Sequence, residues 1–421
     1  MIPLERYLDE ILARVEPMPP LGLPVGQCLG LTLAKDVSAR LDVPRFANSA
    51  MDGFAVRSCD LPDSVELAEG DHAVPTTLPV AGDIPAGDST PHVCAPGSAW
   101  RIMTGARMPA GADTVVKVED TTLPAGPLPL PEQVTITCLP RAGANVRHAG
   151  EDARVGDVVL RAGTVLTPAA LSSAVSIGAS TVSVHPRITA AVVSTGDELA
   201  APGADLDDAQ IPDSNSLLLA ALLTRCDVDV RTQTHCPDDP QRYGELVTEL
   251  ARDHDLIVTS GGVSAGAYDV VKMAGSSFDF IFEKVAMQPG KPQGFARIDT
   301  PEGQAYLAAL PGNPVSVFVS FHLLVRPLLA ALSGQDLRRV HTHRVATASR
   351  GWRSPLGRRQ FVPVHLEEAT RPGDTPIAHP THELGSRSHF AASLHAATGL
   401  AVIAEEVDRV EPWSIIDVIT V

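Results

Sequence analysis

The stretch LIVTSGGVSAGAYD, residues 256–269, decides the fold of this 421-residue chain. It opens with an apolar run that is typical of a buried strand. Two glycines, a serine and a third glycine follow, and they predict a sharp turn. The stretch closes on Asp269. Taken locally, it fits an ordinary turn as well as a backbone loop that comes close to a bound anion.

Two further stretches have the same form. VVSTGDEL (192–199) and ALPGNPVS (309–316) each join an apolar strand to glycine with small hydroxyl, proline or acidic residues. Glycine lets the backbone approach a ligand, and exposed N–H groups at the start of the next helix can bind a phosphate. One such loop is more often only a turn, but three of them favour a shared pocket. None matches the dinucleotide-binding or P-loop pattern.

Strand and helix patterns alternate around these loops. Strands are expected at 188–194, 228–234, 255–260, 278–285 and 304–310, and helices at 213–225 and 238–252, with a long apolar helix from 311 onward. Such alternation predicts a parallel sheet with helices on both faces. Ligands of these folds bind at the carboxyl ends of the strands, where the three loops lie.

The flanking sequence has a different texture. Short β-type runs between Gly- and Pro-rich turns fill residues 20–140 and return after 337. They predict a β-rich insertion and a small C-terminal β-domain. Residues 4–15 have the apolar spacing of an amphipathic helix, either docked on its own domain or contacting a second subunit. Thr167 is the expected N-cap of a further helix, with Pro168 at its first position and Gly178 beyond its end.

Composition excludes several classes of protein. The net charge of −17 argues against nucleic-acid binding, because neutralising phosphates needs a surplus of Lys and Arg. The six cysteines are scattered, so we expect free thiols in a reducing cytoplasm, without a zinc site or a disulfide framework. No apolar run reaches the roughly 18 residues of a membrane span. A soluble, cytoplasmic protein is expected.

Charged residues near the loops point to a metal and an anion. Glu198 and Asp269 each follow a predicted strand, where carboxylates could hold Mg²⁺. Lys284 and Lys291 could supply positive charge, with Lys291 on the rigid turn P-G-K-P. Residues 337–366 hold seven arginines and no acid, either as a face turned toward an anion or as a solvated face. For each acid or lysine alone, a solvated surface residue is the simpler reading.

Eight segments then form a recognisable ordered set: PRFANSAMDGFAV, RIMTGARMPAGADTVV, NVRHAGED, STGDEL, DSN, SGGVSAGAYD, PGKPQGF and LPGNPVS. Together they resemble the molybdopterin molybdenumtransferase family, which includes MoeA of bacteria and the E-domain of gephyrin. The resemblance extends from the first helix to the last strand.

The resemblance implies a multidomain α/β plus β fold with four units. An elongated linker domain with dimer contacts comes from 1–25 and 141–187, and a β-rich domain is inserted at 26–140. A doubly wound, mostly parallel α/β domain that binds molybdopterin covers 188–334. A small β-barrel-like domain covers 335–421. The resemblance also implies a homodimer with the active site between its subunits.

The implied reaction is a Mg²⁺-dependent transfer in molybdenum cofactor biosynthesis. Molybdate is inserted into adenylylated molybdopterin, and AMP is released. Molybdate is a dianion that meets a dithiolene and a pyrophosphate, so Mg²⁺, lysines and N–H groups must neutralise charge. Because the motif loops contain no cysteine, we expect catalysis by positioning and electrostatics without a covalent intermediate.

The resemblance also assigns roles to residues of this chain. Glu198 and Asp269 correspond to the essential acids around the metal and the phosphate. Other functional positions match Asp52, Thr104, Asp152 and Asp238. The pterin-phosphate and anion site matches Asp213, Ser214, Ser260, Gly261, Gly262, Ser264, Lys284, Lys291, Pro311, Gly312, Asn313 and Pro314, and molybdate-side donors match Arg350, Ser386 and Ser388.

One position departs from the family pattern. Some relatives have lysine immediately before P-G-K, whereas this chain has Gln288 and therefore one positive charge fewer. Either Lys284 and Lys291 suffice, or the arginine-rich segment compensates.

Two alternative functions differ from molybdenum insertion. A molybdopterin adenylyltransferase uses a similar α/β unit but lacks the M-D-G segment and the C-terminal β-domain. A gephyrin-like scaffold would not need the glycine-rich loops. Expected partners are a second copy of the chain, the adenylyltransferase and proteins that mature molybdoenzymes, with no nucleic acid and no membrane.

Overall fold

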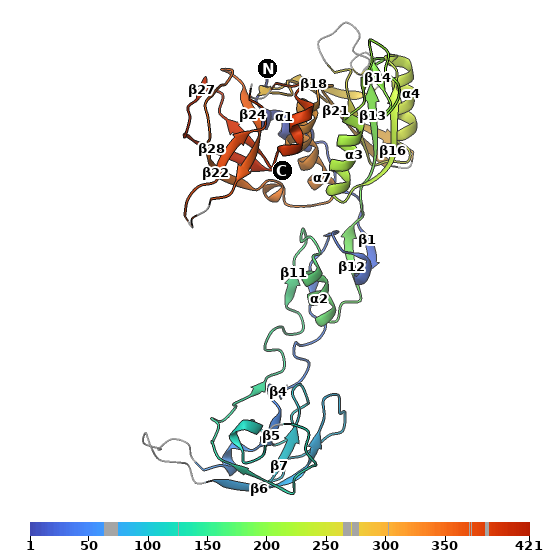
Figure 1. Cartoon of the computed structure of the whole chain (residues 1–421). Helices are drawn as coiled ribbons and strands as arrows, with labels where there is room; N and C mark the ends of the chain where they lie inside the picture. The colour runs from blue at the N-terminus through green and yellow to red at the C-terminus, as the bar shows by residue number, and fades with distance from the viewer. Residues whose placement is uncertain are drawn as a thin grey trace.

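The computed structural model describes residues 1–62, 75–124, 126–263, 271, 278–301, 303–369, 371, 373–383 and 387–421. The protein is elongated (Figure 1). An α/β unit and a C-terminal β-barrel lie side by side at one end, and a narrow linker leads to a separate β-domain at the other. The expected multidomain α/β plus β fold is confirmed.

The α/β unit is built on one six-stranded sheet. Its strand order is β16 (Asp229–Cys236), β13 (Thr189–Thr195), β17 (Leu256–Ser260), β21 (Gly303–Leu310), β20 (Pro292–Thr300) and β18 (Asp279–Lys284). The first four strands are parallel. Helix α3 (Asn215–Arg225) lies in the crossover from β13 to β16, and α4 (Pro240–Leu250) lies in the crossover from β16 to β17. Strands β18, β20 and β21 are antiparallel neighbours.

Side chains alternate between the two faces of this sheet. Along β13, Ala190 and Val192 point into the cluster that contains α3, whereas Ala191 and Val193 point into the cluster that contains α4. All four side chains are fully buried. Helices therefore cover both faces, as the alternating pattern predicts.

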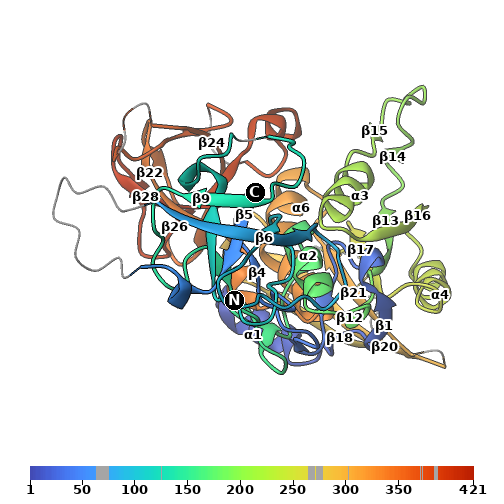
Figure 2. The same ribbon diagram turned by 90° about the horizontal axis from the view of Figure 1, so that it is seen from below.

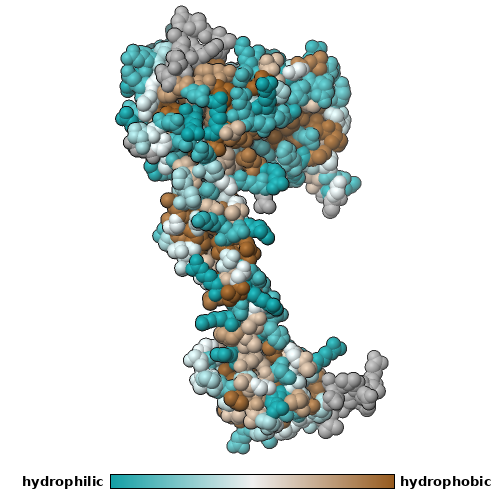
Figure 3. All heavy atoms as spheres, turned by 180° about the vertical axis from the view of Figure 1, so that it is seen from behind, coloured by the Kyte–Doolittle hydropathy of each residue, from teal (hydrophilic) through white to brown (hydrophobic). Residues whose placement is uncertain are grey.

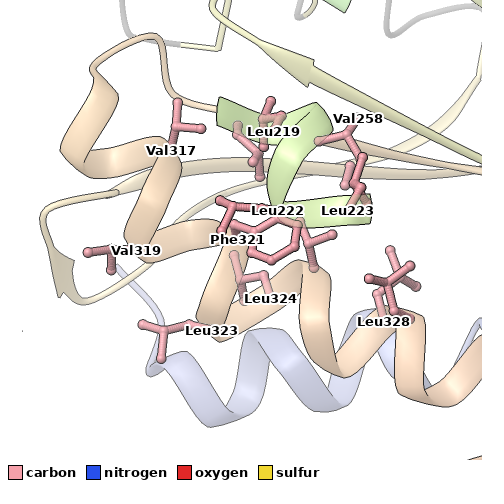
Figure 4. Packing of buried hydrophobic residues seen from close by; sticks show 14 of the residues in the cluster. Leu219, Leu222, Leu223, Val258, Val317, Val319, Phe321, Leu323, Leu324 and Leu328 are labelled. Carbon is pink, nitrogen blue, oxygen red and sulfur yellow. The ribbon is translucent and has the colours of Figure 1, made fainter. Parts of the chain in front are cut away.

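The long apolar helix predicted after 311 is continuous from Pro314 to Leu332. It consists of α6 (Pro314–Ser320), a π-helical turn η6 (Phe321–Val325) and α7 (Arg326–Leu332). Figure 4 shows its Phe321 and Leu324 packed beside the leucines of α3. By length and composition this helix could cross a membrane, contrary to the sequence expectation, but 89% of the apolar stretch is buried inside the protein. It is a core helix.

The first helix, α1 (Leu4–Leu12), also belongs to the core of the α/β unit. Its buried residues Leu4, Tyr7 and Ile11 join the same cluster as α3 and the central helix. The expectation that residues 1–25 lie with the linker is therefore wrong for this helix. An apolar stripe does not specify which domain covers it, and here the larger α/β core does.

The linker is formed by two separate passages of the chain. Strands β1 (Leu21–Pro24) and β2 (Thr32–Leu33) pair with β12 (Thr181–His185), and β3 (Val37–Ser38) pairs with β11 (Val158–Leu160). Helix α2 (Pro168–Ser176) packs beside them. As predicted, the Thr167 hydroxyl accepts the N–H of Ala170 at 3.2 Å, and Gly178 has a positive φ of +86°.

The chain leaves and re-enters the far β-domain at one place. There β4 (Asn48–Ser49) pairs with β10 (Val146–Arg147). The domain itself is a five-stranded sheet in the order β8 (Thr114–Lys117), β5 (Gly53–Val56), β7 (Ala99–Ile102), β6 (Thr76–Ile84) and β9 (Gln133–Ile136). This is the β-rich insertion expected from the turn-rich sequence.

The C-terminal β-domain is a closed barrel. Its strands are β24 (Arg359–Glu367), β25 (Ile377–Pro380), β22 (His343–Ala348), β28 (Ile415–Thr420) and β26 (Gly399–Ile403), and β26 pairs back onto β24. Strand β19 (Met287–Gln288) comes from the α/β unit and pairs with β24. The barrel is therefore hydrogen-bonded to the α/β unit.

Short elements complete the chain. Strands β14 (Leu199–Ala200) and β15 (Ile211–Pro212) form a ribbon that stands out from the sheet beside α3 (Figure 2). Strand β23 (Trp352–Arg353) pairs with β27 (Arg409–Val410). The 3₁₀ turns are η1 (Val25–Gln27), η2 (Ser58–Asp60), η4 (Val118–Asp120), η7 (Leu337–Arg339) and η8 (Ala391–Ala396).

Candidate functional site

The three glycine-containing loops meet at the carboxyl edge of the parallel strands. Ser260 at the end of β17 is the register partner of Ser194 on β13 and of Leu310 on β21. The loops that follow therefore lie next to one another. They form one wall of a cleft of about 1190 Å³ whose opposite side is supplied by β19 and the C-terminal domain.

Gly261 makes the close approach of two loops possible. Its φ is +100°, and a Cβ at this position would lie 2.6 Å from the carbonyl oxygen of Thr195. Its N–H donates to the Leu310 carbonyl at 3.0 Å. Only glycine tolerates both the backbone angle and this contact, so Gly261 joins the ends of β13, β17 and β21 into one surface.

Asn215 connects the third loop to helix α3. Its side-chain N–H donates to the Gly312 carbonyl at 2.6 Å, and the residue is buried. At the same helix end, the Asp213 carboxylate accepts the Ser216 N–H at 3.1 Å. Asp213 thus caps the helix, whereas Asn215 fixes the loop of Pro311–Pro314 against the cleft.

Three buried polar atoms that belong to cleft-lining residues have no hydrogen-bond partner in the described part of the chain. They are Asn215 Oδ1, Ser260 Oγ and Gln288 Oε1. Buried polar atoms are nearly always paired, because leaving one unpaired costs about 1–3 kcal/mol. Their gathering in one cleft indicates that a polar ligand completes their hydrogen bonding.

Two acids in the cleft are available for a cation. The Glu198 carboxylate lies over Gly196, where a Cβ would come within 2.5 Å of its Oε2. Glu198 and Asp238 line the cleft and have no side-chain hydrogen bond or ion pair to another described residue. No group of three or more metal-binding side chains occurs among the described residues. One or two carboxylates with ligand phosphates and water are the usual Mg²⁺ environment, so these residues fit that ion.

Positive charge enters the cleft from both domains. Lys291 reaches it from the α/β unit, and Arg358 and Arg387 reach it from the C-terminal domain. Lys284 does not line the cleft. Its backbone carbonyl instead accepts the N–H of Ile2. The arginine-rich segment therefore supplies Arg358 on the side where Gln288 carries no charge.

Other arginines of that segment are engaged elsewhere. Arg338 pairs with Asp336, Arg344 with Glu368, and Arg359 with Glu5 and Glu405. Arg350 donates to the backbone carbonyls of Pro380 and His382 and does not line the cleft. The expected molybdate-side donor Ser388 does line it, beside Arg387.

Asp52 and Thr104 lie at the opposite end of the molecule. They flank β5 and β7 of the far β-domain, well away from the cleft of the same chain (Figure 1). The Thr104 hydroxyl and N–H both donate to Asp52 Oδ1 at 2.7 Å. These bonds lower the pKa of Asp52 below its ordinary value, the hydroxyl contributing most. Asp152 is exposed at the entrance to this domain, where its N–H donates to the Val43 carbonyl.

Some of the expected site lies outside the described residues, namely Asp269, Ser264 and Ser386. The structure brings together Glu198, Asp213, Ser214, Asp238, Ser260, Gly261, Gly262, Lys291, Pro311, Gly312, Asn313, Pro314 and Ser388. Sequence reasoning did not name Asn215, Arg358 or Arg387 as ligand-binding residues. Asn215 is the third residue of the quoted DSN motif, and Arg387 stands between the two expected serines.

Comparison with known proteins covers the same domains. Residues 2–178 match the MoeA N-terminal region (domain I and II), 191–331 a probable molybdopterin binding domain, and 345–421 the MoeA C-terminal region (domain IV). The crystal structure of the MoeA protein of molybdopterin biosynthesis from Pyrococcus horikoshii matches with a TM-score of 0.79 and 27% identity. That match covers 100% of this chain and 99% of the other.

Two sequence relatives extend over most of the chain. Molybdopterin molybdenumtransferase 2 of Mycobacterium tuberculosis is 41% identical over 400 residues, which cover 93% of this chain and 92% of that protein. Molybdopterin molybdenumtransferase of Haemophilus influenzae is 37% identical over 329 residues, 78% of this chain and 76% of that one. The chain belongs to the molybdopterin molybdenumtransferase family.

Proposed function

We propose that this chain inserts molybdate into adenylylated molybdopterin and releases AMP, as a transferase of molybdenum cofactor biosynthesis. The observation that carries the proposal is the cleft at the carboxyl edge of the parallel strands. It combines Lys291, Arg358 and Arg387 with buried polar atoms that have no hydrogen-bond partner among the described residues. Such a surface suits a ligand with a polar heterocycle, phosphates and a second oxyanion.

Some residues of the cleft bind the ligand by hydrogen bonds, and others neutralise its negative charge. Ser260 and Asn215 offer hydrogen-bonding atoms fixed by buried elements, and the backbone around Gly261 leaves room for a phosphate. Lys291 and the two arginines attract the anions and hold them at short distance. No cysteine lines the cleft among the described residues, so positioning without a covalent enzyme intermediate is the mechanism we propose.

We propose that Mg²⁺ binds at Glu198 and Asp238, together with oxygens of the substrate. When bound there, the ion would neutralise phosphate charge next to the transferred oxyanion. Glu198 is fixed by the ends of β13 and β14, and Asp238 follows β16, so the two acids come from neighbouring strands of the sheet.

The complete site, in our proposal, needs a second copy of the chain. Asp52 and Thr104 are too far from the cleft of their own chain to act there (Figure 1). The linker carries exposed apolar side chains, among them Val155, Val158 and Val175 (Figure 3). A homodimer would cover such residues and bring the far β-domain of one subunit to the cleft of the other.

The test is AMP release by the purified chain supplied with adenylylated molybdopterin, molybdate and Mg²⁺. We expect Glu198→Gln to slow this release by on the order of a hundredfold, because a fixed charge beside the reacting groups is lost. Glu245→Gln, an exposed change on α4, is the matched control. Mg²⁺ titration should show weaker metal activation in Glu198→Gln.

Two outcomes would contradict the proposal. Full activity of Glu198→Gln without any change in Mg²⁺ dependence would remove the role of Glu198. Consumption of ATP with free molybdopterin, without molybdate-dependent AMP release, would identify an adenylyltransferase instead.

A further inference from the structure

A second, smaller cavity lies at the joint between the linker and the α/β unit. Its volume is about 250 Å³, and it is lined by Thr32 and His185 from the linker, by the end of α3 and by α7. Figure 1 shows β1 and β12 directly next to the ends of α3 and α7. The cavity is separate from the cleft, because the two share no lining residue.

The lining of this cavity is positively charged. It contains Arg187, Arg225 and Arg326 and a single acid, Asp227, so three positive charges less one negative leave +2. Asp227 pairs with Arg187 at 2.9 Å. Arg225 and Arg326 have no side-chain partner among the described residues. Such an excess is unexpected in a chain whose net charge is −17.

The two unpaired arginines act on the same neighbouring groups. Burial and then the charge of Arg326 and of other nearby basic groups, Arg225 among them, lower the pKa of His322 to about 3. Both arginines also favour the thiolate of Cys226, against the burial that raises its pKa. Arg225 and Arg326 also line the same cavity of about 250 Å³. Both positive charges would attract an anion bound there.

Thr32 gives an independent indication of a ligand. It lines the cavity, is 1% exposed, and its hydroxyl has no hydrogen-bond partner in the described part of the chain. A buried hydroxyl without a hydrogen-bond partner destabilises the folded protein unless a bound group supplies that partner. The position of Arg225 at the C-terminus of α3 suits the helix dipole, but this explains neither Arg326 nor Thr32.

We propose that this joint binds one small tetrahedral oxyanion of the phosphate or sulfate class, held by Arg225, Arg326 and Thr32. The small volume suits a single oxyanion, whereas pockets for larger ligands usually exceed about 300 Å³. Guanidinium groups match the oxygens of such an ion, and a hydroxyl can donate a further bond. The bound ion links the linker to α3 and α7 and stiffens the joint.

Hydrogen exchange followed by mass spectrometry tests this site. Sodium phosphate, sulfate and molybdate are compared with chloride at matched ionic strength, and peptides covering β12 (Thr181–His185) and 225–228 are followed. We expect each oxyanion to slow exchange there. Lys291→Ala/Arg358→Ala, which alters the cleft, should keep this protection.

In Arg225→Gln/Arg326→Gln, the oxyanion concentration needed for half-maximal protection should rise at least tenfold, because both charge-assisted contacts are lost. Arg231→Gln, an exposed change on β16, is the control for loss of one surface charge and should behave as wild type. Thr32→Val keeps the shape of the side chain and should weaken oxyanion binding about threefold. This variant provides a separate test if the double variant folds poorly.

The proposal is overturned if no oxyanion changes exchange at the joint, or if Arg225→Gln/Arg326→Gln responds as strongly as wild type. AMP tests whether the joint binds the phosphate group of a nucleotide instead of a free oxyanion. Protection by AMP but not by phosphate would show that the joint binds a larger ligand than a single oxyanion.

Discussion

Asp52 shows how a single neighbour sets the charge of an acid. Thr104 donates two hydrogen bonds to it, and both favour the ionised carboxylate. Because the folded-state pKa is lowered, the contribution to stability is present above the ordinary value of about 4 and is lost as pH falls through the lowered pKa. An ionised acid is therefore kept at the tip of the molecule.

Replacing the hydroxyl tests this effect. We expect Thr104→Val to raise the pKa of Asp52 toward its ordinary value, because the side-chain hydrogen bond contributes most to the shift. Carbon-detected NMR titration of the Asp52 carboxyl measures it. Thr104→Ser keeps the donor and should leave the pKa low, and an unchanged pKa in Thr104→Val would show that the hydroxyl is not responsible.

Arg358 is the residue-scale test of the positive charge in the cleft. We expect Arg358→Ala to weaken binding of the anionic substrate molybdate and of the product AMP by about tenfold to a hundredfold, as for loss of a charge-assisted hydrogen bond. Equilibrium binding of molybdate and of AMP, measured by calorimetry, is the readout. Arg409→Ala removes an exposed arginine paired with Glu411 in the same domain and should bind normally. Equal binding by both variants would exclude Arg358.

The site could be predicted from the sequence only in part. Glu198, Ser260 and Lys291 follow strands or sit in a tight turn, so their place at the sheet edge depends on local pattern. Arg358 and Arg387 come from the C-terminal domain, and Arg358 directly precedes β24, which pairs with β19 of the α/β unit. The local sequence does not predict the pairing of β19 with β24.

At the scale of elements, the capped helix α2 gives the clearest test. The Thr167 hydroxyl accepts the Ala170 N–H, and losing such a cap usually costs about 1 kcal/mol. We expect Thr167→Ala to increase hydrogen exchange of α2 amides by about fivefold, while Thr167→Ser stays near wild type. Equal exchange in all three proteins would show that packing alone maintains the helix.

Helix ends and buried strands were predictable because their signals are local, as Thr167 and Gly178 show for α2. Strand β20 was not. The sequence predicts a rigid turn that presents Lys291, yet β20 begins at Pro292 in the same segment. Only two residues separate β20 from β21, which is too short for a crossover, so the sheet ends in antiparallel strands.

At the scale of the whole molecule, the distance between Asp52 and the cleft leads to a mixing experiment. We expect Asp52→Asn and Glu198→Gln proteins each to be nearly inactive. Refolding them together should restore about a quarter of wild-type activity, because half of the dimers are mixed and each has one intact site. AMP release before and after mixing is the measurement. No recovery would mean that the site does not combine these two residues across subunits.

The paired strands β4 and β10 have a consequence for the modular nature of the chain. Asn48 and Arg147 are register partners, so the far β-domain starts and finishes at adjacent points of the linker. A two-residue turn could close that gap without altering the strands. The domain is therefore a cassette: it can be removed or exchanged as a unit, and the remainder still has a continuous path from its first helix to its barrel.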